Sequence, residues 1–256
     1  MWWHRIPKHA YFYWGDLNTL PWVRFLTLET FRYHNPDWKM SLYTSKYSTK
    51  YKKEFSKLNV EVGTTNVEEI ANYDLSMFSN HIQDVCRSDF LRWYLLYEYG
   101  GLWSDMDIIY INSMNNITIA NSSNNTAILP SPYNNFLLTA DHADCFKDLW
   151  RVARECKIED IAKDPFATGP VTYEKVTKNH KYSNLELLPL STTEIADSDG
   201  KDFALDIDMN LNSNTIGVHW HGSGSFGKYI VVTKKNCTYH PSMFARLVAY
   251  ALYLMK

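Results

Sequence analysis

The chain alternates between short apolar runs and longer segments in which apolar residues recur at helical spacing. The short runs predict strands at residues 9–14, 38–44 and 58–63, and helices are expected at 20–34, 79–98 and 140–156. Strands that alternate with helices predict an α/β fold with a mainly parallel sheet covered by helices. Ligands of such sheets bind beyond the carboxyl ends of the strands, so we expect functional residues just after the predicted strands.

The helix predicted around residues 82–97 carries two charged residues in an otherwise apolar pattern. Its apolar stripe consists of Ile82, Val85, Cys86, Trp93, Leu96 and Tyr97. Asp89 falls in the middle of this stripe, and Arg92 lies at its edge, three residues later and therefore close in space. Charged residues are rarely buried without a partner. The pair is either a structural ion pair in the core or the lining of a polar pocket that binds sugar hydroxyls.

A glycine turn and two acidic residues follow this helix. Gly100 and Gly101 allow the backbone to turn tightly from the helix into a strand. In the extended segment that we expect there, Asp105 and Asp107 point to the same side. Two carboxylates on one face repel each other unless a cation lies between them, and Mg²⁺ and Mn²⁺ prefer such oxygens and often bind substrate phosphates. The sequence therefore predicts a site for a metal–diphosphate, such as that of a nucleotide-activated sugar.

The complete segment has a composite motif with a specific spacing. Ser88-Asp-x-x-Arg92 is followed by Tyr97-x-x-Gly-Gly-x-x-x-Asp-x-Asp107. This arrangement resembles the sugar-binding DxD region of retaining glycosyltransferases. The family contains yeast-type initiating α-1,6-mannosyltransferases, bacterial polysaccharide transferases and, more distantly, the clostridial glucosylating toxins.

Other segments resemble the same family. Ile6–Asp16 and Asn35–Thr44 resemble its first two strands, and in the toxin branch the tryptophan at the position of Trp14 stacks on the nucleobase. Aromatic rings suit flat bases, at about 1–3 kcal/mol per stacked base. Without the surrounding motif, Trp14 is simply a half-buried aromatic residue at a strand end. The resemblance of residues 134–136 implies that Asn135 lies near the donor or acceptor sugar.

The segment Gly217–Phe226 resembles the late loop of the family, which closes over the diphosphate and completes the metal site. Two alignments fit: one selects His221 and the other His219. We assign His219 to the metal and His221, with Ser225, to the phosphates, but the choice between the two histidines stays open. Phe226 stands where the family has tryptophan, so this position offers no indole N–H.

The resemblance implies a metal-dependent, retaining glycosyltransferase of the GT-A type, as used in polysaccharide biosynthesis. It would move a hexose from a UDP- or GDP-sugar to a glycan, lipid-linked or other hydroxyl acceptor. Asp107 would bind Mn²⁺ or Mg²⁺, and Asp105 would contact the ion through water or contact the ribose and sugar. Asp89 and Arg92 would orient sugar hydroxyls. The sequence shows no two-carboxylate nucleophile arrangement, so a front-face substitution, in which the leaving phosphate helps to deprotonate the acceptor, is the working hypothesis.

Length and composition favour one folded domain spanning residues 1–256. The 256 residues are 45% hydrophobic, which is enough for a full core. A net charge of −2 without a long basic run argues against a nucleic-acid-binding surface. The four cysteines form no C-x-x-C pair, so we expect free thiols in a reducing compartment.

The expected location is the cytoplasm, because the chain opens directly on its first predicted strand and shows no signal peptide. The apolar helix predicted at 241–256 is too short to span a bilayer. It either packs on the domain or attaches the protein to the surface of a membrane that bears a lipid-linked acceptor. Residues 112–126 are rich in Asn and Ser and are expected to form an exposed loop.

Two other function classes stay open. One is a catalytically inactive carbohydrate- or nucleotide-sugar-binding protein on the same scaffold. The other is a nucleotidyltransferase, which would normally show a Gly-rich, Lys- or Arg-bearing phosphate loop near the first strand, and residues 14–16 offer none.

Two other acidic pairs have the Asp-x-Asp spacing. Asp206 and Asp208 lack the glycine turn and the Asp/Arg helix before them, so they stay a reserve candidate for a metal site. Asp197 and Asp199 are expected in a loop.

Overall fold

The chain forms two compact units, each assembled from three separate stretches of sequence. The computed structural model describes residues 6–117, 126–128, 134–179, 182–194, 203, 211–222, 232–239 and 241–256, with the backbone alone at 126–128 and 179. The first unit comprises Met1–Thr19, Lys39–Ser104 and Ile119–Leu188, and the second comprises Leu20–Trp38, Asp105–Thr118 and Pro189–Lys256. The expected single domain over 1–256 stays a prediction.

A seven-stranded sheet forms the centre of the first unit. Its strands are β1 (His9–Tyr13), β2 (Lys39–Thr44), β3 (Val60–Thr64), β4 (Gly101–Ser104), β6 (Thr126–Ile128), β7 (Phe136–Thr139) and β8 (Leu185–Leu187). They follow the order β3-β2-β1-β4-β7-β6-β8. The strands from β3 to β4 are parallel, β7 is antiparallel to both neighbours, and β8 is parallel to β6. The sheet is therefore mainly parallel, as the alternation of strands and helices predicts.

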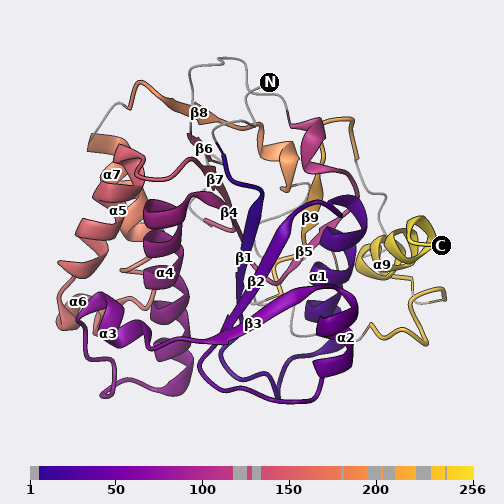
Figure 1. Cartoon of the computed structure of the whole chain (residues 1–256), viewed down its shortest axis with the longest axis horizontal. Helices are drawn as coiled ribbons and strands as arrows, with labels where there is room; N and C mark the ends of the chain where they lie inside the picture. The colour runs from indigo at the N-terminus through magenta and orange to yellow at the C-terminus, as the bar shows by residue number, and fades with distance from the viewer. Residues whose placement is uncertain are drawn as a thin grey trace. The chain divides into compact units, whose positions relative to one another are not determined.

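The helices of the first unit are α2 (Lys52–Lys57), α3 (Val67–Ala71), α4 (Asn80–Tyr99), α5 (Asp144–Arg154), α6 (Ile158–Lys163) and α7 (Pro170–Asn179). Figure 1 shows α3 to α7 gathered on one side of this sheet. Their shared core includes Phe90, Trp93, Leu96, Phe146, Leu149, Ile161 and Val176. Each large apolar side chain buried in this way contributes about 1.5–3 kcal/mol, so packing on α4 fixes the position of the charged pair that this helix carries.

Helix α4 begins and ends at the residues that the sequence indicates. The Ser79 hydroxyl accepts a hydrogen bond from the backbone N–H of Ile82, which caps the first turn. Gly101 follows the helix at φ 101°, and a Cβ there would lie 2.4 Å from the carbonyl oxygen of His9, so only glycine fits. Leu91 and Leu95, outside the predicted apolar stripe, are also buried, because the helix is covered on more than one side.

The second unit is smaller and is built around a two-stranded antiparallel sheet. Strand β5 (Ile108–Tyr110) pairs with β9 (Gly217–His219), and helices α1 (Trp22–His34) and α9 (Met243–Leu254) both pack against β5. Two 3₁₀ helices, η2 (Met114–Asn116) and η3 (Leu190–Thr192), belong to the same unit. Its core includes Leu26, Ile109, Val218, Trp220, Phe244, Leu247 and Val248.

The strand expected after the glycine turn is present as β4, but the expectation that Asp105 and Asp107 lie in extended backbone is wrong. Strand β4 ends at Ser104, residues 105–107 form a turn, and Ile108 begins β5 in the other sheet. Asp105 is half-buried and Asp107 is buried. Because the segment is not extended, the two carboxylates do not follow the alternation of a strand.

The other expectations have mixed outcomes. The C-terminal helix packs into the core of its unit, and none of the four cysteines, all of which are described, forms a disulfide. The exposed loop expected at 112–126 is wrong in part, because Met114 is buried within η2 and β6 begins at Thr126. Among the helices of the described residues, none is long and apolar enough to cross a membrane.

A histidine at the start of β1 gives the first unit a dependence on pH. The His9 ring bonds the Ser41 hydroxyl at 2.8 Å, and burial, assisted by the nearby Lys39, lowers the pKa of His9 to about 4. The unfolded chain therefore binds a proton before the folded chain does as the pH falls. We expect His9 to stabilise the fold above about pH 6.5 and to lose on the order of 2 kcal/mol of this effect by pH 4.

Urea unfolding from pH 8 to pH 4 tests this expectation. The wild-type protein should lose more unfolding free energy across this range than His9→Gln does, since glutamine keeps a polar group but does not titrate. His81→Gln, at an exposed position on α4, is the matched control and should follow the wild type. Equal pH profiles for wild type and His9→Gln would contradict the assignment.

Candidate metal centre and polar cluster

Asp107 lies buried in the turn after β4 and is surrounded by hydrogen-bond donors and cations. The Arg24 guanidinium, from the first turn of α1, lies 2.9 Å from its Oδ2, and the Gly222 N–H donates to the same oxygen at 2.9 Å. The Nε2 of His219 lies 3.3 Å from Oδ1. Burial alone would raise the pKa of Asp107, but Arg24 and His219 outweigh it and hold this pKa well below its usual range. Asp107 is therefore a permanent buried anion.

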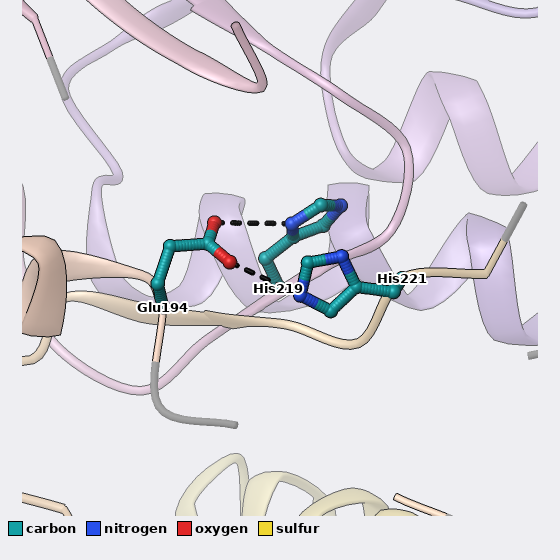
Figure 2. A group of neighbouring side chains, drawn as sticks. All are labelled: Glu194, His219 and His221. Carbon is teal, nitrogen blue, oxygen red and sulfur yellow. Dashed lines mark hydrogen bonds and ion pairs between the residues drawn. The ribbon is translucent and has the colours of Figure 1, made fainter. Parts of the chain in front are cut away.

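His219 connects Asp107 to a second carboxylate, that of Glu194, whose side chain is 9% exposed. Its Nδ1 lies 3.1 Å from Oε1 of Glu194, and the other oxygen of Glu194 lies 3.1 Å from Nε2 of His221, as Figure 2 shows. Burial alone would lower the pKa of His219, but the carboxylates on its two sides raise it to about 10. Burial acts to raise the pKa of Glu194, but the two imidazoles lower it to about 2. Alternating charges thus stabilise this cluster in the interior.

Both histidines reach Glu194 although strand β9 ends at His219 and His221 has a left-handed backbone with a φ of 50°. Trp220 between them enters the core and packs on Phe244. A Cβ on Gly222 would lie 2.4 Å from the Trp220 ring and 2.5 Å from the Arg24 guanidinium, so glycine allows the backbone to approach Asp107.

This cluster has the composition of a metal site. Glu194, His219 and His221 each offer one ligand atom, and these atoms lie within 4.8 Å of one another. One carboxylate and two imidazoles suit a divalent first-row ion. The sequence left the choice between the two histidines open, and the structure brings both to the same carboxylate.

The first unit contains the charged pair that the pattern of α4 indicates. Asp89 and Arg92 are buried, and their Oδ1 and Nη2 atoms lie 3.4 Å apart. The Thr168 hydroxyl donates to Asp89 at 3.0 Å, and Arg92 donates to the backbone carbonyl of Asn134 at 2.6 Å. The ion pair is therefore confirmed, while the sugar-binding role stays a prediction.

One further polar group, the carboxamide of Asn134, belongs to the residue whose backbone carbonyl accepts from Arg92. The carboxamide N and O atoms of Asn134 are buried and have no hydrogen-bond partner among the described residues. A buried amide without partners costs about 1–3 kcal/mol, and a ligand hydroxyl beside Arg92 would recover part of this cost. Asn135, the residue implied by the resemblance, is also buried.

The remaining predicted residues have separate positions. Trp14 follows β1, is half-buried, and donates from its indole N–H to the Thr19 hydroxyl at 3.3 Å. Ser225 and Phe226 lie outside the described residues, as do the two other acidic pairs, Asp197 with Asp199 and Asp206 with Asp208.

Two residues of the cluster around Asp107 and His219 were not predicted from the sequence. Arg24, like Asp89, is a charged residue on the apolar face of a helix, because Leu28 and Phe31, which follow it on the same face of α1, are buried. Glu194 carried no local signal, because its position depends on backbone contacts with a distant segment: the N–H of His219 donates to the carbonyl of Thr193 at 2.9 Å.

Residues 24–124 match the family model described as the glycosyltransferase sugar-binding region containing a DXD motif. A search of curated proteins finds no match.

Three solved structures are similar to this chain. PaToxG glycosyltransferase is 17% identical, with a TM-score of 0.51 and 68% of each chain covered. Galactosyltransferase LgtC, in complex with donor and acceptor sugar analogues, is 12% identical, with a TM-score of 0.50, covering 96% of this chain and 95% of LgtC. Apo glycosyltransferase GlyE of Streptococcus pneumoniae TIGR4 is 13% identical, with a TM-score of 0.51, covering 97% of this chain and 62% of GlyE. The fold is therefore of the GT-A type, and residues 24–124 match the family model of the DXD-containing glycosyltransferase sugar-binding region.

Proposed function

We propose that this protein is a metal-dependent glycosyltransferase that transfers a hexose from a UDP- or GDP-sugar to a glycan or lipid-linked hydroxyl acceptor, with retention. The observation that carries the proposal is the buried Asp107 of the DXD region, in ion-pair contact with a histidine of a metal-suited cluster. The LgtC complex, which holds analogues of both donor and acceptor sugars, supports the same substrate classes for this chain.

Each predicted site residue has a proposed role. Asp105, Asp107 and His219 form the metal site for the donor diphosphate, with His221 and Ser225 near the phosphates. Trp14 stacks on the base. The hydroxyls of the donor sugar contact Asp89, Arg92 and the segment that contains Asn135. The unpartnered amide of Asn134 beside Arg92 supports a polar ligand at this place.

The proposed reaction breaks the bond between the anomeric carbon and the diphosphate oxygen and forms a bond from that carbon to the acceptor oxygen. The acceptor proton leaves with the released nucleoside diphosphate. A divalent ion, when bound, would neutralise charge on this leaving group. The acidic turn and the neighbouring Glu194, His219 and His221 fit such an ion because they offer carboxylate oxygens and imidazole nitrogens, and one ligand atom from each of these last three residues lies within 4.8 Å of the others.

A release assay tests the proposal. Purified protein with Mn²⁺ is incubated with a panel of UDP- and GDP-sugars without an acceptor, and freed nucleoside diphosphate is measured. We expect slow hydrolysis of one donor, which EDTA removes and added Mn²⁺ restores.

Two results would overturn the proposal. Release of pyrophosphate from a nucleoside triphosphate and sugar phosphate would indicate a nucleotidyltransferase. Absence of nucleoside diphosphate release, both without acceptor and with a glycan panel, would indicate an inactive binding protein if calorimetry still showed donor binding.

A further inference from the structure

We propose that a basic, tyrosine-rich surface of the second unit docks on an anionic lipid bilayer. The surface combines the turn at residues 234–239 with the outward face of α9, and its members are Lys234, Lys235, Tyr239, Arg246, Tyr250 and Tyr253. These six residues are called the tyrosine face below. The inference goes beyond the proposed function, because vesicle binding is measured without any sugar donor or metal ion.

Charge is unevenly distributed along the chain. Residues 209–256 contain no Asp or Glu, whereas they contain five basic residues, Lys228, Lys234, Lys235, Arg246 and Lys256, of which Lys228 lies outside the described residues. Residues 1–208 therefore hold all 28 acidic residues of the chain and 21 of its 26 basic residues. An anionic surface attracts the segment that forms the tyrosine face and repels the acidic remainder, which favours one orientation at such a surface.

Exposed tyrosines give the same surface an apolar component. Tyr239 is 74% and Tyr253 is 71% exposed, the two highest values among the large hydrophobic side chains of the described residues. Arg246, Tyr250 and Tyr253 follow one another at i, i+4 and i+7 on α9, so they share one side of this helix. A phenol ring with a polar tip is stable at the bilayer–water boundary, where the ring contacts lipid and the hydroxyl contacts water.

The core of the second unit holds the tyrosine face in place. The opposite side of α9, the yellow helix in Figure 1, is buried in this core through Phe244 and Leu247. Val232 and Cys237 anchor the turn in the same core, and the Ser242 hydroxyl caps α9 by accepting from the N–H of Ala245 at 3.2 Å. Because none of the described helices can cross a bilayer, the surface would lie on the membrane without spanning it.

The composition of the surface favours lipid over other partners. A second copy of this chain would bring the same cations to the same place, so charge repulsion opposes a symmetric dimer through the tyrosine face. Leu252, Leu254 and Met255 are half-buried beside the exposed tyrosines, and aliphatic groups gain nothing from contact with nucleic-acid phosphates. Basic residues next to aromatic and aliphatic side chains are typical of protein surfaces that lie on anionic membranes.

A flotation experiment tests the inference. The full chain is mixed with vesicles of phosphatidylcholine and phosphatidylglycerol in equal parts, or of phosphatidylcholine alone, and the fraction that floats with the lipid is measured. We expect binding to the anionic vesicles only. This binding should weaken as NaCl is added, because salt screens the attraction between the basic residues and the lipid headgroups.

Variants of the tyrosine face separate its two components. Lys234→Gln with Lys235→Gln should weaken binding to the anionic vesicles by about 20–30-fold, since each basic residue near such a bilayer contributes about fivefold. Tyr253→Ser should also weaken binding, whereas Tyr253→Phe keeps the ring and should bind like the wild type. Because all of these side chains are exposed, each variant should unfold at the same urea concentration as the wild type.

Matched controls come from the first unit. Lys147→Gln with Lys163→Gln removes two charges from other exposed positions, Phe166→Ser removes an exposed ring, and both should bind vesicles like the wild type. Absence of wild-type binding, equal binding to both kinds of vesicle, or unchanged affinity in the lysine and serine variants would overturn the inference. Tighter binding to a single-stranded oligonucleotide, or a dimer that Tyr253→Ser dissociates, would do the same. Vesicle binding without release of nucleoside diphosphate would count against the proposed function alone.

Discussion

Replacing Asp107 with alanine is expected to lower nucleoside diphosphate release by at least about 100-fold and the free energy of unfolding by about 3–5 kcal/mol. The stability loss follows because Arg24 is only 8% exposed and its guanidinium loses the carboxylate partner that lies 2.9 Å away. The rate loss follows because the proposed metal site loses a carboxylate and His219 loses its ion-pair partner. Urea unfolding and the release assay measure the two effects separately.

A double variant separates stability from function at this position. Arg24→Met with Asp107→Leu replaces the buried ion pair by apolar side chains, a change that is often neutral or stabilising. We expect its unfolding free energy to return to within about 1 kcal/mol of the wild type, while nucleoside diphosphate release stays low. Arg246→Met, on the solvent-accessible side of α9, is the control for loss of an arginine. Recovery of release in the double variant would show that Asp107 acts only through stability.

Most of the fold of the first unit follows from local sequence patterns. The predicted strands at 9–14 and 38–44 agree with β1 and β2 to within one residue at each end, because apolar runs between polar turns leave little choice. The Gly100–Gly101 step also follows from sequence, since Gly101 lies too close to His9 for any side chain.

The acidic turn shows why other parts could not be predicted. Trp103 and Ile108–Tyr110 are all buried, so the apolar pattern around the two aspartates predicts extended backbone there and gives no sign of a turn between two sheets. Hydrophobicity reports burial but not which sheet buries a residue. The pairing of β5 with β9 joins residues more than 100 positions apart and has no local signal.

The same distinction applies to the candidate sites. Asp89 and Arg92 were predictable because charge in an apolar helical stripe must be paired. Their ion pair is observed, but a buried pair alone does not distinguish a structural role from a sugar-binding role. Glu194 depends on contacts across 25 residues with His219, so its role emerged only from the structure.

Asp89→Asn is expected to reduce kcat/KM for the sugar donor by about 10²–10³-fold, the size of effect that one preorganised polar group at a reacting centre produces. Asparagine keeps the shape and an oxygen that can accept from Thr168, but it removes the charge that pairs with Arg92. Kinetics with the donor identified by the release assay measure this effect. The dependence of release on Mn²⁺ concentration should remain as in the wild type, because Asp105, Asp107 and His219, the proposed metal site, are unchanged.

A structural role predicts a different pattern, and two comparisons separate the roles. Thr168→Val removes a hydrogen bond to Asp89 without touching the charged pair, so it reports the effect of structural loosening alone. Asp144→Asn, exposed at the start of α5, controls for loss of a surface carboxylate. If Asp89 contacts the sugar, Asp89→Asn loses far more kcat/KM than Thr168→Val at equal loss of unfolding free energy. If the pair is only structural, the two variants lose activity in proportion to stability, and the sugar-binding role of Asp89 is wrong.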